Sequence, residues 1–178
     1  ITNANGEITD LDYDSLNNLT AYTDPMSHTT RYGYDETLLI STTNALAQTT
    51  WYSYTTATVA PQPAGLLKKI STPLGTTAYE YNSSGQLTAT TNALDQSSSY
   101  TYNDQGWLES VTDPAGRTNW TCYDLTGKIV RTVVNASGSD ACSDSYQPGS
   151  TVDEDRITTY TYDVVGNLTA VEGPAGRI

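Results

Sequence analysis

The sequence predicts an all-β protein built of tandem antiparallel β-hairpins, each repeat about 21 residues long, that together form a twisted, spiralling strip of sheet. Three observations predict this fold. Tyrosine and threonine, which favour strands over helices, are abundant, and phenylalanine is absent. A tyrosine motif recurs along the chain. Turn-forming residues recur roughly every ten positions, which is typical of short antiparallel strands.

In most copies the recurring motif contains two aromatic residues separated by one position; Leu11 and Thr121 replace the first aromatic in two copies. Its second aromatic recurs at intervals of 21, 20, 27, 21, 21 and 39 residues, at Tyr13, Tyr34, Tyr54, Tyr81, Tyr102, Tyr123 and Tyr162. The two long intervals indicate insertions near residues 55–65 and 135–156. Residues 1–178 are therefore expected to form one array of about seven to eight repeats. The array begins and ends at nearly the same phase of the repeat, so we expect it to be part of a longer one.

Alternation along each strand predicts which side chains share a face. Residues two apart in a strand point to the same side, so both aromatics of a motif should share one face with the leucine of the returning strand. Those leucines are Leu19, Leu87, Leu108 and Leu168. The tyrosines expected to form this structural ladder are Tyr13, Tyr32, Tyr34, Tyr52, Tyr54, Tyr79, Tyr81, Tyr100, Tyr102, Tyr123, Tyr160 and Tyr162.

Each repeat contains two kinds of turn. The first reads Asp-x-x-Gly, as at residues 124–127, and the second reads Asp-Pro-x-Gly, as at residues 113–116. Asp or Asn at the first position, Pro at the second and Gly at the fourth are typical of a type I turn followed by a G1 bulge. Each repeat should therefore contain two short strands and two tight turns.

These units resemble the YD-repeat, or RHS-repeat, family, whose signature is a Tyr-x-Tyr-Asp-x-x-Gly-x-Leu stretch with an Asp-Pro-x-Gly-Arg-like segment between copies. The stretches YTYDVVGNLTAVEGPAGRI and YTYNDQGWLESVTDPAGRT match it nearly position for position. The resemblance implies a sheet strip that spirals into a hollow shell, as in secreted or surface bacterial toxins and in teneurin-type adhesion receptors. In the toxins the shell encloses an effector, and some members contact glycans. The family's C-terminal core motif, with the aspartates that release the effector, has no match here.

Charge and hydropathy exclude several function classes. The chain has 20 acidic and 8 basic residues and a net charge of -12, which disfavours nucleic acid and anionic membrane surfaces as partners. No apolar run approaches the ~20 residues of a membrane-spanning helix, so no membrane insertion is expected. The first residues, ITNANGEITD, do not resemble a signal peptide and lack an initial Met, so we expect the sequence to be an excerpt from a longer chain or a processed piece of one.

The two cysteines are the first candidate site. Cys122 lies in a predicted strand, and Cys142 lies in the longer insertion. A disulfide between them would anchor this insertion to the sheet and stabilise the fold by roughly 3 kcal/mol. Two unpaired thiols are the alternative.

The acidic residues offer two weak metal-site patterns. Asp10, Asp12 and Asp14 are similar to the start of a calcium loop, but the required Gly at the sixth position and Glu at the twelfth are missing, so we interpret them as solvent-facing. A looser cluster lies in the longer insertion, at Asp140, Asp144, Asp153, Glu154 and Asp155. A solvated acidic loop is the favoured interpretation there and calcium binding the alternative. No cofactor is expected.

No arrangement typical of an enzyme is evident. His28 is the single histidine and has no nucleophile and acid in a recognisable constellation, so we predict that the chain is not an enzyme. Trp51, Trp107 and Trp120 lie outside the tyrosine ladder, where they could stack on sugars or be buried between turns of the spiral. Five glycosylation sequons begin at Asn18, Asn82, Asn119, Asn135 and Asn167.

The sequence thus favours a structural role. We expect an extracellular or cell-surface, secreted protein segment that forms part of an encapsulating β-shell or tube. Its partners would be neighbouring repeats of the same chain, an enclosed effector, or identical chains joined into a filament through unpaired edge strands. A glycan-binding adhesin module is the alternative.

Overall fold

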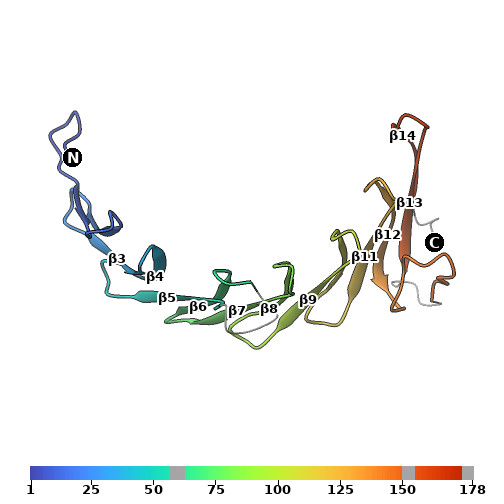
Figure 1. The fold of residues 1–178 in the computed structure, drawn as a ribbon, viewed down its shortest axis with the longest axis horizontal. Helices are drawn as coiled ribbons and strands as arrows, with labels where there is room; N and C mark the ends of the chain where they lie inside the picture. The colour runs from blue at the N-terminus through green and yellow to red at the C-terminus, as the bar shows by residue number, and fades with distance from the viewer. Residues whose placement is uncertain (57–62, 150–154, 174–178) are drawn as a thin grey trace. The chain divides into compact units, whose positions relative to one another are not determined.

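The computed structural model describes residues 1–56, 63–149 and 155–173, which form fourteen β-strands and no helix (Figure 1). The expected all-β fold of tandem antiparallel hairpins is confirmed. The chain falls into two compact units, Ile1–Gln96 and Ser97–Ile178. Within each unit every strand pairs antiparallel with the strand that follows it in the chain.

The first unit begins with a small hairpin in which Thr2 pairs with Ile8. Its strands are β1 (Asp10–Tyr13), β2 (Leu19–Thr23), β3 (Thr29–Asp35), β4 (Leu38–Thr43), β5 (Thr49–Tyr54), β6 (Leu67–Thr72), β7 (Gly75–Tyr81) and β8 (Leu87–Thr91). The strands of the second unit are β9 (Ser97–Tyr102), β10 (Leu108–Thr112), β11 (Thr118–Tyr123), β12 (Ile129–Ala136), β13 (Arg156–Tyr162) and β14 (Leu168–Glu172).

The second tyrosine of each motif lies directly opposite an aliphatic residue of the returning strand. The seven pairs are Tyr13–Leu19, Tyr34–Leu39, Tyr54–Leu67, Tyr81–Leu87, Tyr102–Leu108, Tyr123–Ile129 and Tyr162–Leu168. A β-bulge shifts the register immediately beside every one of these pairs. Such cross-strand pairs stabilise a sheet by about 0.2–1 kcal/mol each, so their repetition favours one register.

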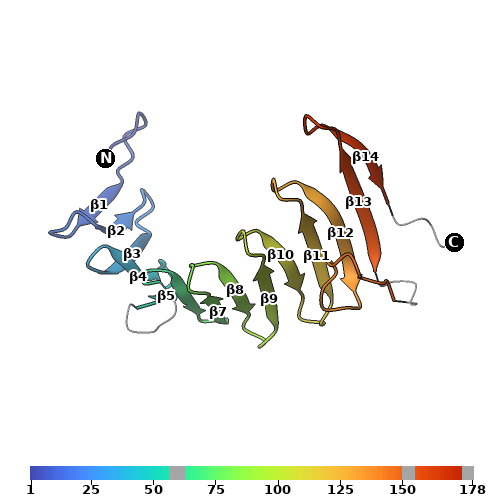
Figure 2. The same ribbon diagram turned by 45° about the vertical axis from the view of Figure 1, so that its right-hand side comes forward.

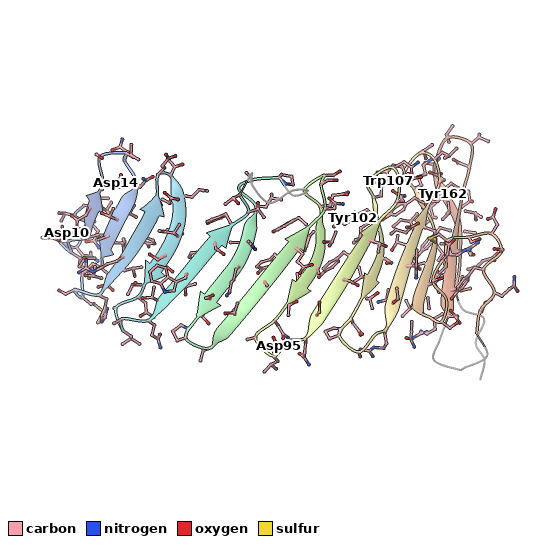
Figure 3. The ribbon with its side chains drawn as sticks, turned by 60° about the horizontal axis from the view of Figure 1, so that its bottom comes forward. Asp10, Asp14, Asp95, Tyr102, Trp107 and Tyr162 are labelled. Atoms are coloured by element: carbon pink, nitrogen blue, oxygen red, sulfur yellow. A yellow bond between two sulfur atoms is a disulfide. The ribbon has the colours of Figure 1, made fainter. Side chains whose placement is uncertain are left out.

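Ten turns within the described residues are held by the same side-chain hydrogen bonds. The Oδ1 atom of an Asp or Asn at the first position accepts the backbone N–H groups of the residues two and four positions later, over 2.8–3.2 Å. These residues are Asn3, Asp14, Asp24, Asn44, Asn82, Asn92, Asn103, Asp113, Asp124 and Asp163. Figure 3 shows that Asp14 and Asp95, which belong to the two kinds of turn, lie at opposite edges of the first unit's sheet.

The residue at the fifth position of most of these turns complements the first. Where the first residue is Asp, a donor follows, as in the bonds from Asn18 Nδ2 to Asp14 (2.9 Å) and from Arg117 Nε to Asp113 (2.7 Å). Where the first residue is Asn, an acceptor follows, as Gln48 does for Asn44 (2.9 Å). The Asn18 amide and the Arg117 backbone N–H hold the pKa of Asp14 and Asp113, respectively, below the ordinary value of 3.8.

The fourth position of these turns always has a positive φ. Glycine occupies it in six turns, at Gly6, Gly85, Gly106, Gly116, Gly127 and Gly166, and other residues occupy it at Asn17, Ser27, Ala47 and Asp95. This is the left-handed residue of the expected G1 bulge, and it is costly for residues that carry a Cβ. The sequence pattern therefore predicted the turn type correctly, although glycine is not required at every copy.

Two turns depart from the common pattern. The turn between β3 and β4 is shorter, because Asp35 pairs directly with Leu38. The turn between β6 and β7 is equally short: Thr72 pairs with Gly75, and the Thr72 hydroxyl accepts the N–H of Leu74 (3.2 Å). A hydroxyl here replaces the missing Asp or Asn, and the register on either side is kept.

The ladder face is the better covered of the two faces along several strands. In β9, for example, Tyr100 and Tyr102 are half-buried, whereas Ser99 and Thr101 are exposed. Few residues reach full burial, and among the described residues Val133 has the largest fully buried side chain. Main-chain pairing, tyrosine ladders and turn hydrogen bonds therefore hold each unit together more than a deep apolar core does.

The positive-φ position gives a direct test of the turn assignment. Replacing Ala47 (φ 58°) with Gly should raise the free energy of unfolding by about 1 kcal/mol, because the left-handed backbone strains an L-residue. Replacing Gly116 (φ 81°) with Ala should lower it by a similar amount, although a Cβ there would meet no atom within 4 Å. Urea unfolding of each variant measures both changes.

The control is Ala45→Gly in the same turn as Ala47, at a position without positive φ. It should not stabilise the protein, because there glycine only adds freedom to the unfolded chain. Stabilisation by both glycine substitutions, or by neither, would contradict the assigned turn.

Candidate functional site

Tyrosine hydroxyls connect successive repeats at the edge that carries the Asp-x-x-Gly turns. The hydroxyl of Tyr81 donates to the carbonyl of Leu67 (2.8 Å), which lies on the preceding strand. The same bond forms from Tyr54 to Leu39 (2.8 Å), Tyr123 to Leu108 (3.0 Å) and Tyr162 to Ile129 (2.8 Å). Backbone pairing between these strands stops short of the tyrosine, so the hydroxyl replaces a missing main-chain bond.

At three of these turns, the residue at the fifth position (Asn18, Trp107 or Lys128) also reaches toward the next repeat. Asn18 Nδ2 donates to the carbonyl of Glu36 (2.7 Å). The Trp107 ring packs against the Tyr123 ring, with 5.3 Å between centroids, and Lys128 Nζ lies 5.5 Å from the centre of the Tyr162 ring. This position therefore carries repeat-to-repeat contacts, a role that the sequence analysis missed.

Glycine in the next turn leaves room for this contact at two places. A Cβ on Gly127 would lie 3.0 Å from the Trp107 ring, and a Cβ on Gly166 would lie 2.7 Å from Lys128 Nζ. Glycine thus serves both the left-handed turn and the approach of the preceding repeat. In the sequence, this contact is signalled by a large residue directly before the leucine or isoleucine of the returning strand and by a glycine in the corresponding turn of the next repeat.

The longer insertion, between β12 and β13, is attached to the sheet through Cys122. Cys122 and Cys142 form a disulfide across 20 residues, and Figure 2 shows the segment folded back beside β12. Arg131 Nη1 donates to the carbonyls of Ala141 and Ser143, both at 3.2 Å. Cys122 lies between Thr121 and Tyr123 in β11, so the insertion covers the face opposite the tyrosine ladder.

This attachment creates the most completely buried region among the described residues. Val133 and Ala141 are 0% exposed and Cys122 is 5% exposed. Val133 pairs with Trp120 on one side and Ile157 on the other, so these side chains share the covered face. The insertion therefore supplies a small local core that the strip itself lacks.

Asp155 closes the base of the same insertion. It is 8% exposed, and its carboxylate accepts the backbone N–H (2.9 Å) and hydroxyl (2.7 Å) of Ser137, the Tyr146 hydroxyl and the Gly149 N–H. Burial alone would raise the pKa of Asp155, but the hydrogen bonds from Ser137 and Tyr146 outweigh it and lower the pKa to about 2. This carboxylate is a structural anchor whose oxygens are already bonded.

The shorter insertion, between β5 and β6, is closed by Thr55. Its backbone exchanges hydrogen bonds with Leu66 (2.8 Å) and Gly65 (2.9 Å), and its hydroxyl donates to the Pro63 carbonyl and accepts the Leu66 N–H (3.0 Å). Thr55 is 6% exposed. Thr55 therefore fixes the point at which the chain leaves the sheet after β5 and returns to it before β6.

The acidic residues considered as metal ligands are dispersed. Asp14 is a turn residue, Asp10 and Asp12 are exposed in β1, and Asp140 accepts the N–H of Ser143 (3.1 Å). Asp144 is exposed, whereas Asp153 and Glu154 lie outside the described residues. Across residues 1–56, 63–149 and 155–173, no group of three or more His, Cys, Asp and Glu side chains is placed to hold a metal ion.

His28 is explained by the turn rule. It occupies the fifth position of the turn that begins at Asp24, and its Nδ1 lies 3.0 Å from Asp24 Oδ2. The contact of His28 with Asp24 is the same one that Asn18 and Arg117 make with their own turn aspartates at other copies.

The three tryptophans differ in exposure. Trp51, in β5, is 56% exposed, whereas Trp107 packs on Tyr123. Trp120 is half-buried, and its Nε1 atom is buried without a hydrogen-bond partner in the part of the chain that the structure describes. Of the three, Trp51 is therefore the one whose ring is open to a ligand.

Most sequon asparagines already use their amide groups. Asn18 and Asn167 donate to their turn aspartates, Asn82 caps its own turn, and Asn119 Oδ1 accepts the N–H of Asn135 (2.9 Å). A glycan on Asn18, Asn82 or Asn167 would compete with these bonds. Glycosylation of the five sites stays a prediction.

Known proteins share the repeated turn and the tyrosine–leucine pair of this chain. The RHS Repeat family profile matches residues 13–37, 63–94 and 81–118. The chain belongs to the RHS-repeat family. Double-stranded DNA deaminase toxin A of Burkholderia cenocepacia (strain H111) is 30% identical to it over 121 residues. That match covers 67% of this RHS-repeat chain and 8% of the relative.

Solved structures with the same fold are much longer proteins. The crystal structure of TcdB2-TccC3 without its hypervariable C-terminal region superposes with a TM-score of 0.64 at 15% identity, covering 91% of this chain and 9% of that one. The TcdB2-TccC3 structure gives a TM-score of 0.63 over the same shares. This RHS-repeat chain therefore spans less than a tenth of the length of these proteins.

A membrane-spanning helix must be long and apolar. None of the residues in 1–56, 63–149 and 155–173 forms a helix long and apolar enough to cross a bilayer.

Tyr81→Phe tests the hydroxyl contacts between repeats. Loss of the bond to the Leu67 carbonyl should lower the free energy of unfolding by about 1 kcal/mol, which is typical of one intramolecular hydrogen bond. The matched control is Tyr79→Phe, on the same face of β7, since the Tyr79 hydroxyl makes no hydrogen bond to a described residue. Equal effects of the two substitutions in urea unfolding would contradict the assigned role.

Removal of the disulfide tests the attachment of the longer insertion. Cys142→Ala should lower the free energy of unfolding by about 3 kcal/mol, because it frees a loop of about 20 residues. It should also expose residues 137–149 to proteolysis. Reduced wild-type protein is the control and should match the variant. Complete thiol labelling of unreduced, unfolded protein would instead show that the two cysteines are not joined.

Proposed function

We propose that this chain is a wall segment of an RHS-repeat shell that encloses an effector of a secreted toxin. The observation that most supports this proposal is the repetition of one hairpin unit whose side chains make contacts with the adjacent repeat. The tyrosine hydroxyl bonds, the Trp107 contact and the Lys128 contact all act between neighbours. A unit of this kind is suited to extend a sheet, because the side chains of each repeat are covered by those of the neighbouring repeat.

The relatives support this proposal. The curated relative is named a toxin, and the superposed structures are of TcdB2-TccC3 proteins. The proposal includes secretion and an extracellular location, because a disulfide between Cys122 and Cys142 suits an oxidising compartment. The proposed role is non-enzymatic, and it agrees with the turn contact of His28, the turn contact of Asp14 and the place of Asp155 at the base of the insertion.

Cryo-electron microscopy of the native, full-length protein tests the proposal. The expected result is a closed wall in which these repeats surround additional density. An open strip with solvent on both faces would overturn it. A helical assembly of identical chains would favour the filament arrangement instead, in which exposed strand edges join copies end to end.

Glycan binding is the second candidate function. The observation that favours it is the Trp51 ring, which is 56% exposed on a sheet face. Aromatic rings that combine an apolar face with a polar edge are common in recognition surfaces. This candidate is compatible with a wall segment, since a shell has a surface that can bind sugars.

A further inference from the structure

The longer insertion meets the sheet through a short tip, which we define as residues 139–145. Both ends of the tip are exposed, and within these seven residues, all of which the structure describes, Ala141 is the one that is buried. Arg131 in β12 donates from Nη1 to the carbonyls of Ala141 and Ser143, both at 3.2 Å. Little of the tip is therefore packed, and its disulfide to Cys122 is its main attachment.

The base of the insertion is held together independently of the tip. The Asp155 carboxylate accepts hydrogen bonds from Ser137, which precedes the tip. The same carboxylate accepts bonds from Tyr146 and Gly149, which follow the tip. The insertion thus consists of a base closed by its own hydrogen bonds and a tip joined to β11 by one covalent bond.

Two features of the covered face oppose closure of the tip. Burial raises the pKa of Glu109 in β10 above its ordinary value of 4.5, and the negative charges of Asp140 in the tip and of Asp104 raise it further. Trp120 pairs with Val133 on the covered face, and its Nε1 atom is buried without a partner among the described residues. Facing like charges and a buried donor without an acceptor both cost free energy, which hydration would relieve.

Arg131 places a positive charge beside both sulfur atoms. It lies directly opposite Cys122 on the paired strand, so the two side chains share a face. Its guanidinium binds the carbonyls of residues 141 and 143, which flank Cys142. No acidic side chain among the described residues forms an ion pair with it. A neighbouring cation stabilises a thiolate, and a stabilised thiolate is a better leaving group in disulfide exchange.

We propose that the Cys122–Cys142 disulfide is a redox-controlled latch, which a dithiol reductant opens with the help of Arg131 and whose opening releases the tip from the sheet. Cys122 is 5% exposed and Cys142 is half-buried, so the reductant attacks the Cys142 sulfur. The S–S bond breaks, a mixed disulfide forms at Cys142, and Cys122 leaves as a thiolate that takes up a proton. The second thiol of the reductant then displaces Cys142 as a thiol, and the reductant ends as its own disulfide.

Release of the tip uncovers part of the local core of the second unit. Val133, Trp120 and Ile157 share the covered face and become accessible to solvent. Asp155 still holds the base, and the tyrosine ladder on the other face is not involved. The latch makes this surface respond to the thiol redox state of the compartment. This inference goes beyond the proposed wall segment and depends only on contacts within the second unit.

Hydrogen exchange followed by mass spectrometry tests the release in the native, full-length protein. The oxidised protein is compared with protein reduced by dithiothreitol, a dithiol. Peptides that contain the tip should exchange roughly tenfold faster after reduction, because local opening no longer requires cleavage of a covalent bond. Peptides from β9 and β10 should exchange at an unchanged rate. Carbene footprinting should label Val133 and Ile157 more strongly in the reduced protein, and reoxidation should reverse both changes.

Substitution of Arg131 tests its part in opening the latch. Arg131→Gln should slow reduction by dithiothreitol by about threefold or more, measured by differential alkylation of the two cysteines, whereas Arg131→Lys should keep most of the rate. Loss of the Arg131 bonds to the tip would by itself loosen the tip and speed reduction, so a slower rate reports the charge. The matched control is Arg156→Gln, which pairs with Val134 and therefore lies on the other face. It should leave the rate unchanged.

Four results would overturn the latch. The first is a disulfide that resists dithiothreitol in the folded protein. The second is unchanged exchange of the tip after both cysteines are reduced. The third is equal acceleration of exchange in β9 and β10, which would make the disulfide a staple of the whole unit. The fourth is an Arg131→Gln variant that is reduced as fast as the wild-type protein or faster. The microscopy tests the wall segment separately, whatever these results are.

Discussion

The fold depends above all on one side-chain oxygen at the start of ten of the described turns. An Asp or Asn Oδ1 accepts two backbone N–H groups and so fixes the five residues that reverse the chain. A turn of fixed length sets the register of the strands on both sides, and register decides which side chains share a face. Five of the seven tyrosine–aliphatic pairs flank such a turn, whereas Tyr34–Leu39 and Tyr54–Leu67 flank the shorter β3–β4 turn and the insertion closed by Thr55.

The two faces of the strip then have different roles. The tyrosine face carries the ladder, and its hydroxyls complete main-chain pairing near the turn edge. The opposite face lacks such a ladder, and its use differs along the chain. In the second unit the Cys122-linked insertion covers it, whereas in the first unit Trp51 and Arg31 remain exposed. A repeat array can thus add local features to one face without disturbing the ladder on the other.

Much of the fold could be predicted from the sequence because its determinants are local. The spacing of Tyr100 and Tyr102 predicts a common face, and the Asp-x-x-Gly pattern predicts the turn. The hydroxyl contacts between repeats could not be predicted, because they depend on how far adjacent strands separate near Tyr81, and the contact of Trp107 leaves only an indirect signal in the sequence. The same holds for the insertion: two cysteines suggest a link, but only the structure shows which face the segment covers.

Amide hydrogen exchange followed by NMR tests the central constraint most directly. The N–H groups at the third and fifth turn positions, such as those of Ala115 and Arg117, lie in exposed turns yet donate to Asp113 Oδ1. The account predicts that these amides exchange slowly at all ten turns and that Asp113→Ala accelerates exchange at its own turn. Exchange at the rate of free, solvated amides in the wild-type protein would contradict it.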